Sequence, residues 1–473
     1  MDPLSHVDVE ANTRNPPAAT EEWNVPRPST LPEWAQSNQH NFEPVSDETV
    51  TEKSIMNSII PHMRLLCLHF SPIWFSITMG TGVVALLLQN IPYRFNGLDI
   101  LAKIVFALNL LFFVLFIIIS MIRYIAWPQV FWLMIYDPSH SMFLGCVSMG
   151  FATLINMCVL GFDAEGRGGA FHLFVWVLWW INTAFSIWIC AGITFVMATR
   201  HNHELKGVTS VLILPIVSVV VDAASGAIVS DVLPVSAAKI TIVVSYLILG
   251  AGMGTTVLIM TLYYARLIFH KVPNAKLIVS VFLPLGPCAQ GAYAFMHLAT
   301  SIQKLGKDAG QSLVGGDVLS QEDAHIMNLG IVGVSLLSGL FLWGFAFFWL
   351  ILAIAMWIDV WWVAKIKFNL SWWGCTFPIG VYGLATMEVG QVMDSGSFRI
   401  LGIVITLCVI VLWLFVSLRT LWFLCRGKMY VSKLNLTLAS LILALVKRVF
   451  HLNLYNPVNT ASYPVAKTWL GPS

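Results

Sequence analysis

The segment SWWGCTFPIGVYGLATM, residues 371–387, is apolar and long enough to enter a lipid bilayer, yet it contains Pro378 and three glycines. A proline removes one backbone hydrogen-bond donor and frees a carbonyl group. In lipid, such groups are tolerated only where protein or a water-filled cavity satisfies them. The segment therefore predicts a membrane helix that faces a cavity, with Phe377 beside the proline.

The composition of the whole chain is typical of a polytopic membrane protein. Of its 473 residues, 58% are hydrophobic and 11% are charged, whereas about 25% of residues are charged in soluble domains. Residues 1–60 hold ten Asp/Glu and three Lys/Arg, so the rest of the chain holds 23 Lys/Arg and 14 Asp/Glu. A basic excess beside membrane spans sets their orientation.

Crossing the hydrocarbon core of a bilayer takes roughly 20 apolar residues. Ten runs of this kind are present, at 71–91, 98–122, 139–161, 170–199, 208–231, 238–266, 276–299, 328–357, 371–393 and 399–421. With a cytoplasmic amino terminus, fourteen Lys/Arg flank the spans on the inner side and seven on the outer side. Because Lys and Arg accumulate on the cytoplasmic side, we expect both termini to be cytoplasmic.

The chain divides into four predicted regions. Residues 1–58 are expected to be a disordered acidic cytoplasmic tail, and residues 59–70 an interfacial pre-helix. Residues 71–425 form the ten-helix transmembrane domain, and residues 426–473 a cytoplasmic tail with a membrane-surface helix at 434–446. No cleavable signal peptide is expected, because the first apolar run begins late and follows acidic, Pro-rich residues.

The prolines follow a pattern when the spans are numbered in chain order. Each intramembrane proline falls in an odd-numbered span, and these spans are also rich in small and polar residues: Pro72, Pro215, Pro284, Pro287 and Pro378. A period of two helices predicts an all-α membrane fold of five helical hairpins, whose odd-numbered helices are broken and line a central pore. The alternative is that Gly, Ser and Pro serve only to pack helices together, as Gly250 and Gly254 of span six suggest.

Several side chains in the odd-numbered spans could serve a transported solute. Ionisable groups within a membrane are costly, about 3 kcal/mol each, so Asp222 and Glu388 are candidate proton-coupling or gating carboxylates. The alternative is that each is a structural, hydrogen-bonded carboxylate. Weak donors suit a conducting anion pore, and the candidates for its lining are Ser76, Thr78, Thr81, Ser148, Ser218, Ser225, Gln290 and Tyr293. For Gln290 and Tyr293, a packing role is the alternative.

Signatures of enzymes and metal sites are missing from the sequence. It has no HExxH, GxSxG or P-loop motif, so we expect no enzymatic activity. The eight cysteines lie nearly all within apolar runs and form no CxxC pair, which indicates buried free thiols. His201 and His203 have no companion ligands in their loop. We therefore expect no cofactor, no metal and no nucleic-acid partner.

Four sequence motifs together resemble a known family. They are HFSPIWFSITMGTGVVALLLQNIPY at 69–93, FVWVLWW at 174–180, FLPLGPCAQGAY at 282–293 and WWGCTFPIG at 372–380. The chain resembles the tellurite-resistance and dicarboxylate transporter family, which includes the plant guard-cell slow anion channels. Within that family it is most similar to the fungal sulfite efflux pumps, and next to the fungal malic acid transporters. The resemblance covers about 70–425.

The resemblance implies a pore ringed by the five odd-numbered helices in a plasma-membrane protein. It also implies a small inorganic anion as substrate, sulfite or bisulfite, and a homotrimer of separately conducting subunits. The phenylalanine next to the span-nine proline, here Phe377, would plug the pore. Asp222 and Glu388 match no motif of the family.

The membrane potential favours export over import for such a pore. An interior-negative potential expels a monovalent anion by about 2.3 kcal/mol per 100 mV, so bisulfite leaves without coupling. Import of a malate dianion must work against twice this free energy, so it needs coupling to proton movement. We expect export of sulfite or bisulfite. The alternatives are a proton-coupled C4-dicarboxylate (malate) transporter, in which Asp222 or Glu388 takes the proton, and a membrane receptor or sensor.

Overall fold

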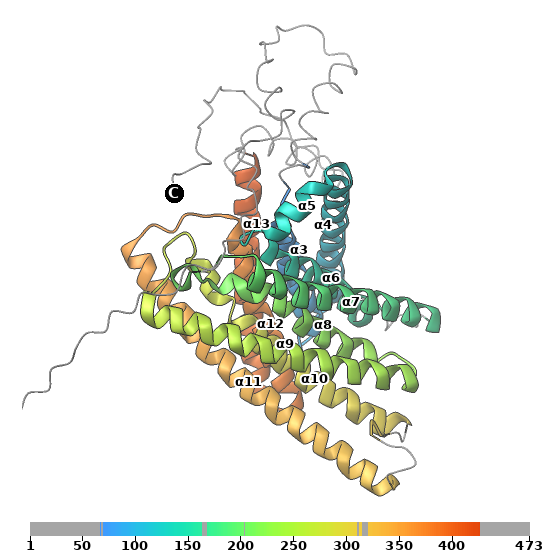
Figure 1. The fold of residues 1–473 in the computed structure, drawn as a ribbon. Coiled ribbons are helices and arrows are strands. Elements are labelled where there is room, and N and C mark those ends of the chain that lie inside the picture. The colour runs from blue at the N-terminus through green and yellow to red at the C-terminus, as the bar shows by residue number, and fades with distance from the viewer. Residues whose placement is uncertain are drawn as a thin grey trace, which may run out of the picture. The chain divides into compact units, whose positions relative to one another are not determined.

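The computed structural model describes residues 67, 70–162, 168–202, 204–309, 312–314 and 320–425. Within these residues every regular element is a helix (Figure 1). All of them belong to one compact unit, 57–473. The predicted tails at 1–58 and 426–473, with the predicted surface helix, lie outside the described residues, as does most of the predicted pre-helix at 59–70.

Two sets of helices alternate along the chain. The five shorter helices, here called the inner helices, are α3 (Phe75–Asn90), α6 (Leu144–Phe162), α8 (Leu214–Ser230), α10 (Leu285–Ala309) and α12 (Trp373–Val392). Each is followed by a longer outer helix: α4 (Leu98–Ala126), α7 (Gly169–Thr199), α9 (Val235–His270), α11 (Gln321–Val363) and α13 (Gly396–Cys425). A short helix, α5 (Pro128–Tyr136), lies between α4 and α6.

Burial separates the two sets. The most apolar windows of α3, α6, α8 and α10 are 78–94% buried, and most residues of α12 are buried as well. The corresponding windows of the outer helices are only 22–33% buried. Helices that are apolar on every side and exposed face lipid in a membrane. This division agrees with the one predicted between odd-numbered and even-numbered spans.

The inner helices contact one another in a closed order, α3, α6, α8, α10, α12 and back to α3. Each inner helix also packs against the outer helix that follows it in the chain. The inner helices therefore surround a common axis, and the outer helices cover them.

Nine helices of the described residues are long and apolar enough to cross a membrane. The inner helix α12 is not among them, although it has 20 residues. Its glycines, threonines and Glu388 make it less apolar than the others, and its burial spares it from contact with lipid. The chain is an all-helical, multi-pass membrane protein, and ten spans in five membrane hairpins stay a prediction.

A short 3₁₀ segment precedes each inner helix, directly for four of them and two residues earlier for α10: η2 (Pro72–Trp74), η3 (Ser141–Phe143), η6 (Ser210–Ile213), η7 (Ile278–Phe282) and η8 (Leu370–Trp372). Pro72 begins η2, Pro215 lies in the first turn of α8, and Pro284 and Pro287 lie at the start of α10. A proline fits at a helix start, because the missing N–H has no intrahelical acceptor there. Four of the five prolines therefore lie at or near helix starts, and their role as helix breaks at a pore stays a prediction. Pro378 lies inside α12.

Glycines let the inner helices approach one another closely. A Cβ atom added at Gly145 of α6 would lie 2.2 Å from the carbonyl oxygen of Leu214 at the start of α8. One added at Gly80 of α3 would lie 2.3 Å from Oγ1 of Thr376 on α12. Both contacts are too short for any larger residue, so these glycines set the spacing of the inner helices.

Candidate functional site

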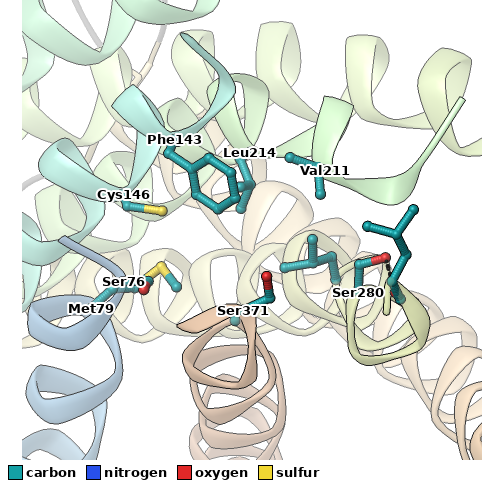
Figure 2. Close-up of a pocket in the computed structure, with 11 residues that line it drawn as sticks. Ser76, Met79, Phe143, Cys146, Val211, Leu214, Ser280 and Ser371 are labelled. Carbon is teal, nitrogen blue, oxygen red and sulfur yellow. Dashed lines mark hydrogen bonds between the residues drawn. The ribbon is translucent and has the colours of Figure 1, made fainter. Parts of the chain in front are cut away.

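Two cavities lie among the inner helices. The first, here called the amino-end cavity, is lined at the starts of all five inner helices by Ser76, Met79, Phe143, Cys146, Val211, Leu214, Leu277, Ser280, Leu283, Ser371 and Gly374 (Figure 2). The second, the carboxy-end cavity, is lined by Leu86, Asn90, Thr153, Asn156, Val221, Ile228, Gln290, Tyr293, Phe377, Val381 and Leu384.

The two cavities follow one another along the axis of the inner helices. On every inner helix or the turn before it, a residue of the amino-end cavity is followed seven positions later by one of the carboxy-end cavity: Met79 and Leu86, Cys146 and Thr153, Leu214 and Val221, Leu283 and Gln290, Gly374 and Val381. Seven residues of α-helix rise about 10.5 Å. All five inner helices therefore run in the same direction, with their amino ends at the amino-end cavity.

Phe377 lies between the two levels on α12. It is one helical turn past Gly374 of the amino-end cavity and one turn before Val381, and it lines the carboxy-end cavity. Its side chain is 3% exposed. The ring therefore lies at the side of the carboxy-end cavity that is nearest the amino-end cavity.

The wall of the amino-end cavity offers few free donors. Figure 2 shows the side chains of Ser76, Ser280 and Ser371 among apolar neighbours such as Phe143 and Leu214. The hydroxyl of Ser76 donates to the carbonyl of Ile73 at 2.6 Å, and that of Ser280 donates to the carbonyl of Leu277 at 2.7 Å. None of the residues that line either cavity is Lys, Arg or His.

Asp222 lies in a buried network that faces α7. Its side chain is 0% exposed, and it accepts hydrogen bonds from Nδ2 of Asn182 at 2.7 Å and Oγ1 of Thr183 at 2.6 Å. Ser148 joins the network by donating to Oδ1 of Asn182 at 3.0 Å. Asp222 and Ser148 are not among the residues that line the two cavities. Neutral amide and hydroxyl donors thus satisfy this carboxylate, and its role in coupling or gating stays a prediction.

Glu388 belongs to a cluster of charged groups, here called the ionic cluster, formed by Asp231, His297, Lys304 and Glu388. Nε2 of His297 lies 3.4 Å from Oδ2 of Asp231, and its Nδ1 lies 3.3 Å from Oε1 of Glu388. Lys304 pairs with Asp231 from the next turns of α10. The cluster thus joins the end of α8 to α10 and α12.

Asp231 follows α8 directly and lies just beyond the membrane-spanning segment Ser210–Ser230 of the structure, which ends one residue earlier than predicted. Burial would raise the pKa of its carboxyl, but hydrogen bonds and charges from His297 and Lys304 outweigh this effect and lower the pKa from 3.8 to about 2. The carboxylate is therefore ionised across the physiological range.

Tyr293 connects the ionic cluster to the carboxy-end cavity. It lines that cavity, and its ring stacks on the imidazole of His297 with centroids 5.4 Å apart and planes at 24°. His297 and Asp231 are absent from the residues that the sequence singled out. The available signal was the spacing of Tyr293 and His297, which places both on one face of α10. The partner Asp231 gave no such signal, because it lies on another helix.

Of the eight residues predicted to line an anion path, three line a cavity: Ser76, Gln290 and Tyr293. The others bond within their own helix or to an outer helix. Thr78 donates to the carbonyl of Phe75, Ser218 to that of Pro215, and Ser225 to that of Val221. Thr81 accepts a hydrogen bond from Nε1 of Trp413 on α13. Their places on the anion path stay predictions.

Seven of the described cysteines are free thiols, as the sequence indicates. The predicted burial holds for Cys67, Cys146, Cys288 and Cys375, whereas Cys158 and Cys190 are partly exposed and Cys408 is exposed. The described residues also hold no group of three His, Cys, Asp or Glu that could bind a metal ion.

Comparison with known proteins places the architecture in a family of membrane transport proteins. The chain is 37% identical over 364 residues to the sulfite efflux pump SSU1 of Arthroderma benhamiae, which covers 76% of this chain and 92% of that pump. It is 28% identical over 341 residues to the sulfite efflux pump SSU1 of Candida albicans, covering 68% of this chain and 66% of that pump. A malic acid transport protein of Schizosaccharomyces pombe is 24% identical over 347 residues, with 73% of this chain and 76% of that protein covered.

The sequence model of the voltage-dependent anion channel family matches residues 69–421. This range contains all the inner helices and both cavities. Members of the family are channels or transporters. The family resemblance drawn from the sequence motifs is confirmed, and the chain belongs to the voltage-dependent anion channel family.

Proposed function

We propose that this protein exports sulfite, as bisulfite, through a pore along the axis of the inner helices, and that Phe377 closes the pore. The observation that carries the proposal is the pair of cavities in register along that axis, with Phe377 between their levels. The similarity to sulfite efflux pumps at 37% identity supports the choice of substrate.

Helix dipoles make the amino-end cavity attractive to anions. An α-helix carries about half a positive elementary charge at its amino end. Five amino ends meet at this cavity. The cavity thereby gains a positive potential without any fixed cation in its wall. An anion is drawn in but is not trapped, which suits conduction.

The orientation makes export passive. With both termini cytoplasmic, the amino ends of the inner helices face the cytoplasm, so a cytoplasmic anion enters the amino-end cavity first. An interior-negative membrane potential then drives a monovalent anion outward by about 2.3 kcal/mol per 100 mV. We place the protein in the plasma membrane, where this gradient acts, and we propose that it assembles as a homotrimer, as the family resemblance implies.

A proton-coupled malate transporter is the second candidate. It is supported by the similarity to a malic acid transport protein and by the ionic cluster, in which Glu388 pairs with His297 beside the carboxy-end cavity. In this case Glu388→Gln or Asp222→Asn should abolish pH-dependent uptake of malate. Under the first proposal both variants should retain bisulfite efflux.

The experiment that tests the proposed function is a flux assay in proteoliposomes with sulfite, malate, nitrate and chloride supplied separately at the same membrane potential. We expect sulfite to move fastest, and to do so without a pH gradient. Malate flux that requires a pH gradient, with no sulfite flux, would reject the proposal in favour of the second candidate. No flux of any of the four anions would favour a receptor or sensor.

A further inference from the structure

Two side-chain amides in the wall of the carboxy-end cavity have unmet hydrogen-bonding capacity. Asn156 of α6 is 3% exposed and Gln290 of α10 is 4% exposed, and both line the cavity. Oδ1 of Asn156 and Oε1 of Gln290 are buried and have no hydrogen-bond partner. Leaving a buried polar atom unsatisfied is unfavourable, so two such atoms at one cavity call for an explanation.

Two neighbouring polar groups of the same cavity are already engaged. Nδ2 of Asn90 donates to the carbonyl of Leu86 at 2.8 Å. Oγ1 of Thr153 donates to the carbonyl of Gly150 at 2.7 Å. Asn156 and Gln290 therefore differ from these neighbours in having groups left over for a ligand.

We propose that Asn156 and Gln290 form a binding subsite for a protonated oxyanion, namely bisulfite, on the outer side of Phe377. This inference rests on the proposed function and adds to it the residues that select the substrate. The two residues line the same cavity from different inner helices, α6 and α10, and the proposed site places the anion between their amides.

The chemistry of a primary amide matches this ligand. Each amide has two N–H donors and one carbonyl acceptor, and a half-turn of the amide exchanges their positions. The N–H groups donate to the charged oxygens of bisulfite. The single O–H of its hydroxyl form donates to one of the two orphaned carbonyl oxygens, and the other amide turns its N–H groups toward the anion. Chloride and nitrate have no O–H to donate, and they leave the acceptor unpaired.

The neutral character of the site also suits transport. A Lys or Arg at this level would hold an anion tightly, whereas two amides give a weaker site from which the anion can leave. Selection then depends on pairing of donors and acceptors, because a site that hydrogen-bonds a hydroxyl discriminates against ligands that lack it.

The inference is tested with Asn156→Leu and Gln290→Met, which keep side-chain size close to that of the wild type. Each full-length variant is reconstituted in proteoliposomes, and bisulfite, chloride and nitrate fluxes are measured on the same preparation. Loss of the hydrogen bond from the ligand O–H to the amide carbonyl, which chloride cannot make, should lower the bisulfite-to-chloride flux ratio about tenfold. The ratio does not depend on the amount of folded protein, so partial misfolding cannot produce this result.

Gln89→Met is the matched control. Gln89 is a buried glutamine of the inner helix α3, but it lies outside both cavity walls and donates from Nε2 to the carbonyl of Leu160 at 3.0 Å. Its variant should keep the wild-type ratio. An unchanged ratio in both Asn156→Leu and Gln290→Met, with bisulfite flux present in the wild type, would overturn the subsite and leave the proposed function standing. Absence of bisulfite flux in the wild type would instead reject the proposed function.

Discussion

Replacing Phe377 with Ala removes the ring that lies between the levels of the two cavities. The side chain is 3% exposed. If it closes the pore as proposed, an anion passes along the axis only when the ring leaves its packed position. Removing a fully buried Phe side chain from its apolar surroundings costs about 1.5–3 kcal/mol. Each 1.4 kcal/mol or so corresponds to a factor of ten in rate, so we expect Phe377→Ala to raise anion flux roughly 10- to 150-fold.

The same substitution should weaken folding, because a buried Phe→Ala change typically costs about 3–5 kcal/mol of stability. Flux must therefore be expressed per folded protein, measured by size-exclusion chromatography of the detergent-solubilised sample. Phe116→Ala is the matched control. Phe116 of α4 is 1% exposed, packs against Phe70 and Phe75, and lies outside both cavity walls.

The assay is anion flux from proteoliposomes at a fixed membrane potential, with wild type, Phe377→Ala and Phe116→Ala compared. Both variants should lose stability, but only Phe377→Ala should gain flux. Unchanged or reduced flux in folded Phe377→Ala would refute the reasoning that the ring closes the axis. An equal gain in Phe116→Ala would show that loosened packing, and not an opened constriction, raises the flux.

Three further predictions concern folding and coupling. Gly145→Ala should lower the free energy of unfolding by about 1–3 kcal/mol, since its Cβ would meet the carbonyl oxygen of Leu214. Gly250→Ala should not lower it, because nothing lies within 4 Å of the added Cβ. Equal thermal unfolding temperatures of the two variants in detergent would contradict this prediction. Asp231→Asn should cost about 1.5–3 kcal/mol at neutral pH. Because the pKa of Asp231 is lowered from 3.8 to about 2, its stabilisation is present above pH 3.8 and is lost as the pH falls through 2. A difference between wild type and variant that is as large at pH 2 as at neutral pH would be inconsistent with it. Glu388→Gln should keep bisulfite flux within about twofold of wild type without a pH gradient, since passive movement along a weak-site pore needs no titrating group; complete loss would point to a coupled carrier.

The division of the helices could be predicted from the sequence. The odd-numbered spans combine proline with small and polar residues, and the even-numbered spans are apolar on every side. That contrast reports which helices are surrounded by protein and which by lipid. This contrast can be seen without knowing how any helix is rotated about its axis. The burial of the helices follows the predicted division into odd-numbered and even-numbered spans closely.

The direction in which each side chain points could not be predicted in the same way. Successive helical residues are rotated by about 100°, so a small error in placing the axis moves a residue from the cavity to a helix contact. Ser148 and Asp222 illustrate this, because both face α7 and both hydrogen-bond to the side chain of Asn182. Asn156 was missed for the same reason, since nothing in its local sequence marks it as lining a cavity.

Contacts between distant helices were likewise out of reach. The pairing of His297 with Asp231 and Glu388 joins three inner-helix segments. A search for single ionisable residues within the spans found Glu388 but could not supply its partners. The helix starts near Pro72, Pro215 and Pro284 could not be predicted either. A proline fits both a helix start and a kink, and the sequence alone leaves both open.

The most direct test of anion passage along the inner helices is the sulfite flux of the wild-type protein in proteoliposomes with a potassium diffusion potential and no pH gradient. We expect flux that rises with the imposed potential and reverses direction when the potential is reversed. Sulfite flux that is absent under these conditions, or that begins only when a pH gradient is added, would contradict passive export.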